Sequence, residues 1–126
     1  MIYYDQLTSH FLLEKFPELN KDIENEMTFL QEELPHCLYP DVLIPHLMNF
    51  FRFSETKDDS LVKKIFAFFE YLASNGDRET KNLLQVSLLE PLWDYKKSYA
   101  GALQYMDNET KKIFIGMSSY LNKPTI

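Results

Sequence analysis

Four side chains able to bind a metal ion lie in one short stretch of the sequence, Glu33, His36, Cys37 and His46. Glu33 and His36 have the Glu-x-x-His spacing of di-iron helix bundles, which need two such motifs and two further carboxylates. The sequence contains the motif once, and Pro35 inside it disturbs the helical geometry that would aim both side chains at one ion. His36, Cys37 and His46 are too few and too loosely spaced for the four ligands of structural zinc. We predict no metal site and no cofactor, with a metal-dependent enzyme built on Glu33, His36 and His46 as an alternative.

Nucleophilic catalysis is the second chemistry that this stretch suggests, because Cys37 has histidines near it in the sequence. A lone cysteine beside leucine and tyrosine is typical of a small buried hydrophobe, and no oxyanion motif accompanies it. The glycines stand alone at positions 76, 101 and 116, which excludes a glycine-rich loop for a phosphate or a dinucleotide. The sequence therefore predicts a protein without catalytic residues.

Acidic side chains dominate the first half of the chain. Residues 1–63 carry 12 acidic and 5 basic side chains, whereas residues 64–126 carry 7 and 8, and the net charge is -6. This balance disfavours direct binding to nucleic acid, because such binding rests mainly on Lys and Arg at phosphates. Ordinary solubility is one explanation of the acidity. A docking surface for a basic protein is the other, with the candidate residues Asp22, Glu24, Glu26, Glu32, Glu33, Glu55, Asp58 and Asp59.

A group of aromatic residues follows Pro91. Trp93, Tyr95 and Tyr99 lie close to two lysines in the sequence. Tryptophan and tyrosine are favoured as anchors in protein interfaces, so these three residues are candidate partner-binding residues. The alternative is that their rings close one end of the hydrophobic core.

Apolar residues recur at helical spacing along most of the chain. The pattern predicts helices over residues 2–16, 18–34, 42–53, 60–74, 77–91, 94–106 and 108–121. Three prolines make residues 35–45 a linker or a distorted helix start, and Asn75-Gly76 reads as a left-handed helix stop. With 3 glycines and 6 prolines, the chain has few turn residues for a β-sandwich or barrel. We therefore predict a single all-α domain over residues 1–126.

Six or seven short helices can be arranged in two ways. Consecutive helical hairpins stack in α-solenoids, and short helices also form compact bundles. No repeat period recurs clearly enough in the sequence to select one, so both arrangements stay open. Asp58, Asp59, Asp77 and Asp107 are predicted to cap the helices that follow them.

The cysteine content and the first residues bear on the compartment. One cysteine allows no internal disulfide, and the N-terminal residues lack the basic segment, apolar run and cleavage site of a secretory signal. The apolar stretches are far shorter than the roughly 18–20 residues that cross a bilayer. We predict a cytoplasmic protein without a membrane segment and leave its oligomeric state open.

The C-terminal third resembles a known group of proteins. The segment Asn82-Leu-Leu-Gln-Val-Ser-Leu-Leu-Glu-Pro-Leu-Trp-Asp94, followed by Tyr99, Met106 and Thr110-Lys111-Lys112, is similar to small all-helical bacterial immunity proteins encoded beside polymorphic or contact-dependent toxins. The resemblance implies a cytoplasmic protein that binds a cognate toxin domain, often a nuclease, and blocks its active site or substrate surface. It implies no catalytic residues.

Two functional hypotheses follow. The leading one is a non-enzymatic immunity protein whose acidic N-terminal half, with aromatic anchors, binds a toxin made basic by its grip on RNA or DNA. The alternative is a helical-repeat adaptor or regulatory module that binds a peptide or protein on a concave face.

Overall fold

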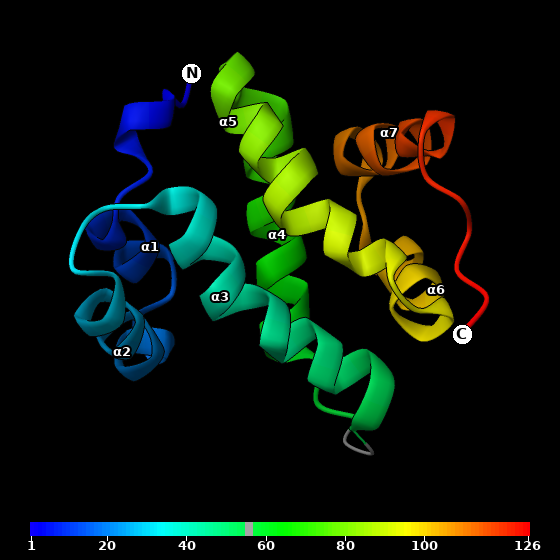
Figure 1. The fold of residues 1–126 in the computed structure, drawn as a ribbon, viewed down its shortest axis with the longest axis horizontal. Coiled ribbons are helices and arrows are strands. Elements are labelled where there is room, and N and C mark those ends of the chain that lie inside the picture. Colours follow the sequence, from blue (N-terminus) through cyan, green and yellow to red (C-terminus); the bar gives the residue numbers. More distant parts are fainter. Residues whose placement is uncertain (55–56) are drawn as a thin grey trace.

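The helical pattern of the sequence is realised in seven α-helices. The structure, a computed structural model, describes residues 1–54 and 57–126, and within them no strand is formed. The helices are α1 (Ser9–Lys15), α2 (Asn20–Leu30), α3 (Pro35–Met48), α4 (Ser60–Asn75), α5 (Arg78–Leu83), α6 (Lys96–Tyr105) and α7 (Asn108–Gly116) (Figure 1). The predicted all-α class is confirmed.

Tighter and wider helical turns lengthen two of these helices. A π-helical turn, Asn49–Phe53, continues α3, and a second one, Leu84–Leu89, continues α5. A 3₁₀ turn, Glu90–Trp93, then leads toward α6, with its proline in the first turn, where a missing N–H costs nothing. The predicted helix over 77–91 is therefore one continuous helical segment that changes from α to π to 3₁₀ geometry.

The proline-rich stretch 35–45 is a helix, and the expectation of a linker there is wrong. Pro35 begins α3, and Pro40 and Pro45 lie inside it. An internal proline costs a helix roughly 3 kcal/mol, while each fully buried large apolar side chain contributes about 1.5–3 kcal/mol. The burial of six α3 side chains outweighs the two prolines: Leu38, Tyr39, Val42, Leu43, Ile44 and Leu47.

Ile2 and Tyr3 are extended and Tyr4–Gln6 forms a 3₁₀ turn, whereas the apolar spacing predicted a helix from residue 2. The N–H of Ile2 donates to the carbonyl of Asn75 at 2.6 Å, and the N–H of Asp77 donates to the carbonyl of Ile2 at 2.7 Å. Thr8 accepts a hydrogen bond from the N–H of Phe11 at 3.2 Å and so caps α1. The side chain of Ile2 is buried, which explains why its spacing resembled that of a helix.

Two helix ends differ from the prediction. Gly76 is extended (φ -73°, ψ 148°) rather than left-handed, because it faces Ile2 across an isolated β-bridge. The left-handed residue is Gln31 (φ 62°), which ends α2 four residues before the predicted end. The predicted caps at Asp77 and Asp107 are confirmed, since their carboxylates accept hydrogen bonds from the first turns of α5 and α7.

The helices pack around α4. It contacts α3, α5, α6 and α7, and Figure 1 shows it between α1–α3 on the left and α6–α7 on the right. In a solenoid each repeat contacts only its neighbours, whereas here α4 packs on α7 and the Asn49–Phe53 turn packs on α6. One cluster of buried side chains draws on all seven described helices, so the arrangement is the compact one of the two.

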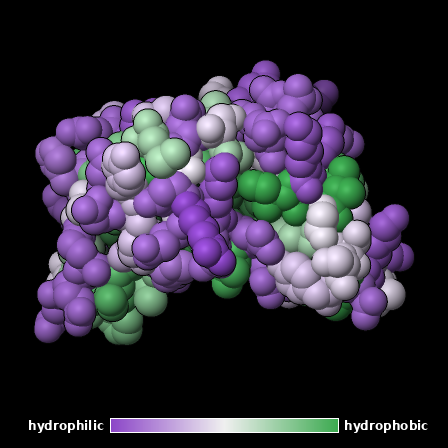
Figure 2. Space-filling view, turned by 90° about the horizontal axis from the view of Figure 1, so that it is seen from above, coloured by the Kyte–Doolittle hydropathy of each residue, from purple (hydrophilic) through white to green (hydrophobic). Residues whose placement is uncertain are grey.

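The face of the molecule seen in Figure 2 is mostly hydrophilic. Figure 2 shows the face seen from above, where hydrophobic side chains reach the surface between the centre and the α6–α7 end. Scattered apolar side chains of this kind are common on folded proteins. Within the described part of the chain, none of the helices combines the length and apolarity needed to cross a membrane.

Candidate functional site

Helices α2 and α3 bring part of the predicted acidic set together. They are neighbours that run in opposite directions, because the left-handed Gln31 reverses the chain after α2. A hollow of about 280 Å³ opens between them. This α2–α3 groove is lined by Asp22, Asn25, Glu26, Asp41, Val42, Pro45 and His46.

One end of the α2–α3 groove holds a contact between a histidine and an aspartate. The imidazole Nε2 of His46 lies 2.8 Å from the Oδ2 of Asp22, and both side chains are partly exposed. The pair joins the first turn of α2 to the last turn of α3. No lysine or arginine is among the residues that line the groove with its three carboxylates, Asp22, Glu26 and Asp41.

The middle of the groove holds two carboxyl groups side by side. Partial burial raises the pKa of Glu26, and the charge of Asp41 and a hydrogen bond to Asp41 raise it further. Two carboxylates this close repel each other when both are ionised. A positively charged group placed in the groove would relieve that repulsion.

An exposed phenylalanine continues the same face of α2. Asp22, Asn25, Glu26 and Phe29 follow the 3-4-7 spacing that lines up one side of a helix. The side chain of Phe29 is 81% exposed, the largest exposure of any large apolar residue away from the two chain ends. Phe29 was not among the predicted binding residues, although its position off the buried apolar stripe of α2 is a signal that the sequence contains.

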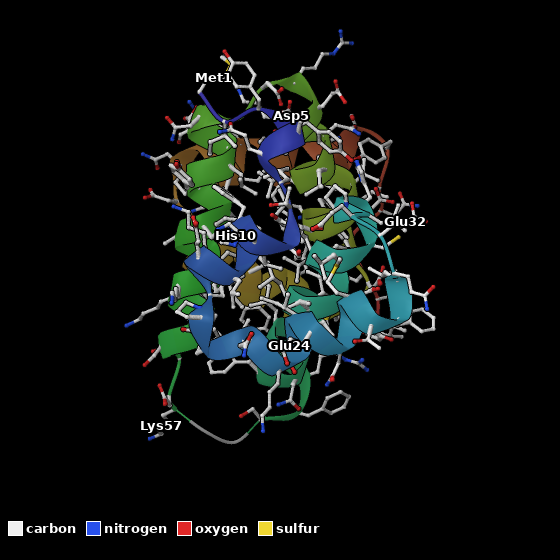
Figure 3. The ribbon with its side chains drawn as sticks, turned by 90° about the vertical axis from the view of Figure 1, so that its left-hand side faces the viewer. Met1, Asp5, His10, Glu24, Glu32 and Lys57 are labelled. Atoms are coloured by element: carbon white, nitrogen blue, oxygen red, sulfur yellow. The ribbon has the colours of Figure 1, made fainter. Side chains whose placement is uncertain are left out.

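Two other acidic candidates lie outside the groove, Glu24 in the middle of α2 and Glu32 beyond its end. Glu24 is exposed on the helix, and Glu32 is exposed in the turn that follows it (Figure 3). Within the described part of the chain neither carboxylate has a basic partner. Both contribute negative charge around the groove.

Glu33 has a structural role. Its carboxylate accepts hydrogen bonds from the N–H of Ser9 at 2.7 and 3.1 Å and from the Ser9 hydroxyl, so it caps the start of α1. Burial raises the pKa of Tyr39, whose hydroxyl donates to the carbonyl of Thr8, and the charge of Glu33 raises it further. Neither Glu32 nor Glu33 lies on α2, contrary to the predicted helix over 18–34.

Asp58 and Asp59, near the start of α4, do not line the groove. Glu55 lies outside the described residues. Asp58 accepts hydrogen bonds from the N–H and hydroxyl of Ser60, and this lowers its pKa. Asp59 accepts a hydrogen bond from the hydroxyl of Tyr105 at 2.8 Å and lies 3.6 Å from the ammonium of Lys63.

Of the three predicted aromatic anchors, Trp93 is buried, whereas Tyr95 and Tyr99 are half-buried. Trp93 is only 4% exposed, and its ring centroid lies 4.8 Å from that of Tyr99 and 5.3 Å from that of Phe114. The prediction of Trp93 as a surface anchor is therefore wrong, because the 3₁₀ turn directs its side chain into the core. Tyr95 is half-buried, with the guanidinium of Arg52 3.3 Å from its ring centroid.

The metal-binding candidates are dispersed. His36 Nδ1 lies 2.9 Å from the hydroxyl oxygen of Ser87, and His46 pairs with Asp22. Cys37 is exposed rather than buried, since α3 turns the neighbouring Leu38 and Tyr39 inward. Among residues 1–54 and 57–126, no three side chains of His, Cys, Asp and Glu come together as a metal-binding group.

Comparison with known proteins gives a family. No curated protein and no solved structure matches the chain. A family described as "Domain of unknown function (DUF7674)" matches residues 9–122, which span all seven helices. Since the match covers far more than half of the sequence, the chain belongs to the DUF7674 family.

Proposed function

We propose that this protein is a non-enzymatic, immunity-type protein that binds and neutralises a basic toxin domain in the cytoplasm. Its contact surface is the α2–α3 groove together with Phe29, Glu24 and Glu32. A lysine or arginine of the toxin enters the groove between Glu26 and Asp41. The toxin is a protein that must itself grip RNA or DNA, which makes its surface basic.

The Glu26–Asp41 pair is the observation that carries the proposal. The charge of Asp41 raises the pKa of Glu26, and two ionised carboxylates side by side cost folding free energy in the unbound protein. A cationic side chain from a partner turns the cost into a gain, because it forms charge-assisted hydrogen bonds with both carboxylates. The arrangement is therefore better suited to a complex than to the free protein.

Phe29 supports the same surface. Tight interfaces concentrate their affinity in a few large side chains, which neighbouring polar residues shield from water. Phe29 projects into solvent on the face of α2 that carries Asp22 and Glu26. An apolar pocket on the toxin would bury this ring while the surrounding carboxylates meet basic residues.

The acidic side chains of the N-terminal half speed association with a basic toxin. Complementary fields steer two proteins together and raise the association rate, and salt screens the effect. Exposed Glu24 and Glu32 add to this field without being tied to other described side chains. Inhibition by occlusion needs no catalytic group, which agrees with a protein that acts by binding.

Co-expression with the product of the immediately upstream gene tests the proposal. We expect rescue of growth and a complex that survives purification. The variants Glu26→Lys and Phe29→Ala should lose rescue, and Phe29→Ala should weaken binding by roughly thirtyfold, the effect of an interface anchor worth about 2 kcal/mol. The matched control is Asp94→Lys, a charge reversal at an exposed residue outside the groove.

Association rates measured over a salt series separate steering from contact. Glu24→Lys should slow association by about threefold at low salt and flatten its salt dependence, with little effect on dissociation. Glu33 is unsuitable for this experiment because it caps α1. Equal rescue and equal affinity for all variants and the control would overturn the proposed surface, and a complex without rescue would favour the adaptor hypothesis.

A further inference from the structure

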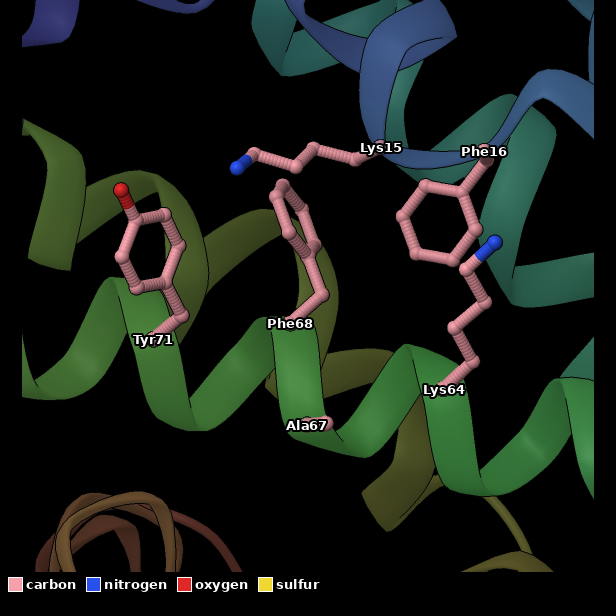
Figure 4. A pocket seen from close by; sticks show the side chains of 6 residues that line it. All are labelled: Lys15, Phe16, Lys64, Ala67, Phe68 and Tyr71. Carbon is pink, nitrogen blue, oxygen red and sulfur yellow. The ribbon is translucent and has the colours of Figure 1, made fainter.

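A second hollow, of opposite charge, lies between α1 and α4. Lys64, Ala67, Phe68 and Tyr71 follow one face of α4 at helical spacing, and the end of α1 supplies Lys15 and Phe16. Together these six residues line a space of about 310 Å³, here called the α1–α4 groove (Figure 4). It shares no residue with the α2–α3 groove.

The floor of the α1–α4 groove is aromatic and preformed. Phe16 is fully buried and Phe68 is 5% exposed, and their rings meet edge to face with centroids 5.3 Å apart. The short side chain of Ala67 leaves space on the surface of α4 between Lys64 and Tyr71. An apolar group laid in this hollow would lie on Ala67 and on the exposed edge of Phe68, whose ring Phe16 holds in place from below.

The two lysines differ in their partners. The ammonium of Lys64 donates to both carboxylate oxygens of Glu18, at 2.8 and 2.9 Å. The ammonium of Lys15 lies 4.8 Å from the ring centroid of Tyr71 and 5.3 Å from that of Phe11, and no carboxylate pairs with it within the described residues. Figure 4 shows the Lys15 ammonium on the Tyr71 side of Phe68 and the Lys64 ammonium beside Phe16. Lys15 therefore gives the groove one uncompensated positive charge.

We propose that the α1–α4 groove binds a small organic carboxylate with an aromatic body. The ring stacks over Ala67 and Phe68, and the carboxylate accepts hydrogen bonds from the Lys15 ammonium. One uncompensated ammonium matches one negative charge. The volume is at the lower end of small-molecule sites, which limits the ligand to about one ring and a short acid chain.

Titration with three matched probes tests this site by ¹H–¹⁵N NMR of the whole chain. 3-Phenylpropionate carries the acid, 3-phenylpropionamide is its neutral counterpart, and 3-phenylpropylamine carries a positive charge on the same body. We expect saturable shifts at residues of the groove with the acid, with a Kd on the order of 1 mM for so few atoms. The amide should bind about tenfold more weakly, and the amine should not bind.

Three variants locate the contacts. Lys15→Gln should weaken binding of the acid by about tenfold and leave the amide unchanged, whereas Ala67→Leu should abolish the shifts for both by filling the hollow. Lys21→Gln removes the same charge from an exposed position outside the groove and should bind like the parent chain. Ala67 is exposed and leucine is a good helix former, so unchanged thermal unfolding is expected to show that this variant is folded.

The proposal is overturned if 3-phenylpropionate gives no saturable shifts at concentrations well above 1 mM, or if all three probes bind alike. It is also overturned if Lys15→Gln and Lys21→Gln have the same effect. These outcomes are independent of toxin binding, because the probes, the groove and the variants are all different from those of the acidic surface.

Discussion

Glu70 on α4 accepts two hydrogen bonds from Thr110 on α7, one from the backbone N–H and one from the hydroxyl, each at 2.9 Å. The N–H of Glu109 donates to the same carboxylate at 3.2 Å. A helix leaves its first N–H groups without partners, and here a side chain from another helix satisfies them. The contact fixes the position of α7 on the central helix, although forty residues separate the two partners in the sequence.

Removal of the Glu70 carboxylate should therefore destabilise the protein. We expect Glu70→Ala to lower the free energy of unfolding by about 1–2 kcal/mol, the range found for loss of a helix cap. Urea denaturation measures the change. Glu24→Ala, at an exposed position in α2, is the matched control and should change stability by less than about 0.5 kcal/mol. Equal effects of the two substitutions would contradict the role assigned to Glu70.

The same contact predicts a pH dependence. Burial alone would raise the pKa of Glu70, but the hydrogen bonds from Thr110, Glu109 and Ser74 outweigh burial and lower it. The stability that Glu70 contributes is thus present above the ordinary glutamate pKa and is lost as pH falls through the lowered pKa of the folded state. Denaturation of the parent chain and Glu70→Gln over an acid pH series should show a smaller acid-induced loss in the variant.

The Glu26–Asp41 pair should behave in the opposite sense. Because the pKa of Glu26 is raised in the folded state, its contribution to stability is fully present below the ordinary glutamate pKa and is lost as pH rises through the raised pKa. We expect Glu26→Gln to stabilise the protein at neutral pH by about 0.5 kcal/mol, and the gain should vanish in acid. Glu24→Gln is the control. A loss of stability in Glu26→Gln would show that the pair is favourable in the free protein.

Two glycines form a matched pair for a packing experiment. A Cβ on Gly76 would lie 2.5 Å from the carbonyl oxygen of Leu72 and 2.7 Å from the Cγ2 of Thr80, whereas one on Gly116 would meet no atom within 4 Å. Gly76→Ala should lower the free energy of unfolding by about 1–3 kcal/mol, because backbone must move. Gly116→Ala, at the end of α7, should raise it by up to about 1 kcal/mol. Thermal unfolding of both variants would reveal the contrast, and a shift of the same sign in both would refute it.

The fluorescence of the protein should report on the core, because Trp93 is its one tryptophan. With 4% of its side chain exposed, Trp93 should emit at short wavelength and be quenched weakly by acrylamide, and both properties should be lost on unfolding. A partner bound at the α2–α3 groove should leave the emission unchanged. Strong quenching in the folded protein would place Trp93 at the surface and restore it as a contact anchor.

The apolar periodicity was enough to predict the helical class and most helix positions. It overlooked α3 as a helix before residue 42, because local proline signals oppose a helix there. The burial of six α3 side chains against the rest of the fold, Leu43 and Leu47 among them, offsets these signals. It also extended the first helix to Ile2, since a buried residue in an extended segment has the same apolar character as one in a helix.

The candidate site was only partly accessible from the sequence. The acidic residues could be identified from their residue types. The groove, however, also depends on Asp41 and His46, which lie on α3 and contact α2 only in the folded protein, so no pattern in the sequence shows that they lie beside Glu26. Glu32 and Glu33 are both glutamates, but only the carboxylate of Glu33 accepts hydrogen bonds from Ser9 and caps α1. Trp93 was predicted to be an interface anchor because the sequence alone does not distinguish an exposed tryptophan from a buried one.

The bridge between Ile2 and the α4–α5 corner has a mechanical consequence. Two backbone hydrogen bonds hold Ile2 against Asn75 and Asp77, and the N–H of Tyr4 also donates to the side-chain carboxylate of Asp77. A corner between two helices can act as a hinge, but this one is braced by the start of the chain. A pulling force on the first residues would therefore act directly on the corner between α4 and α5. We expect the two helices to move together until these hydrogen bonds break.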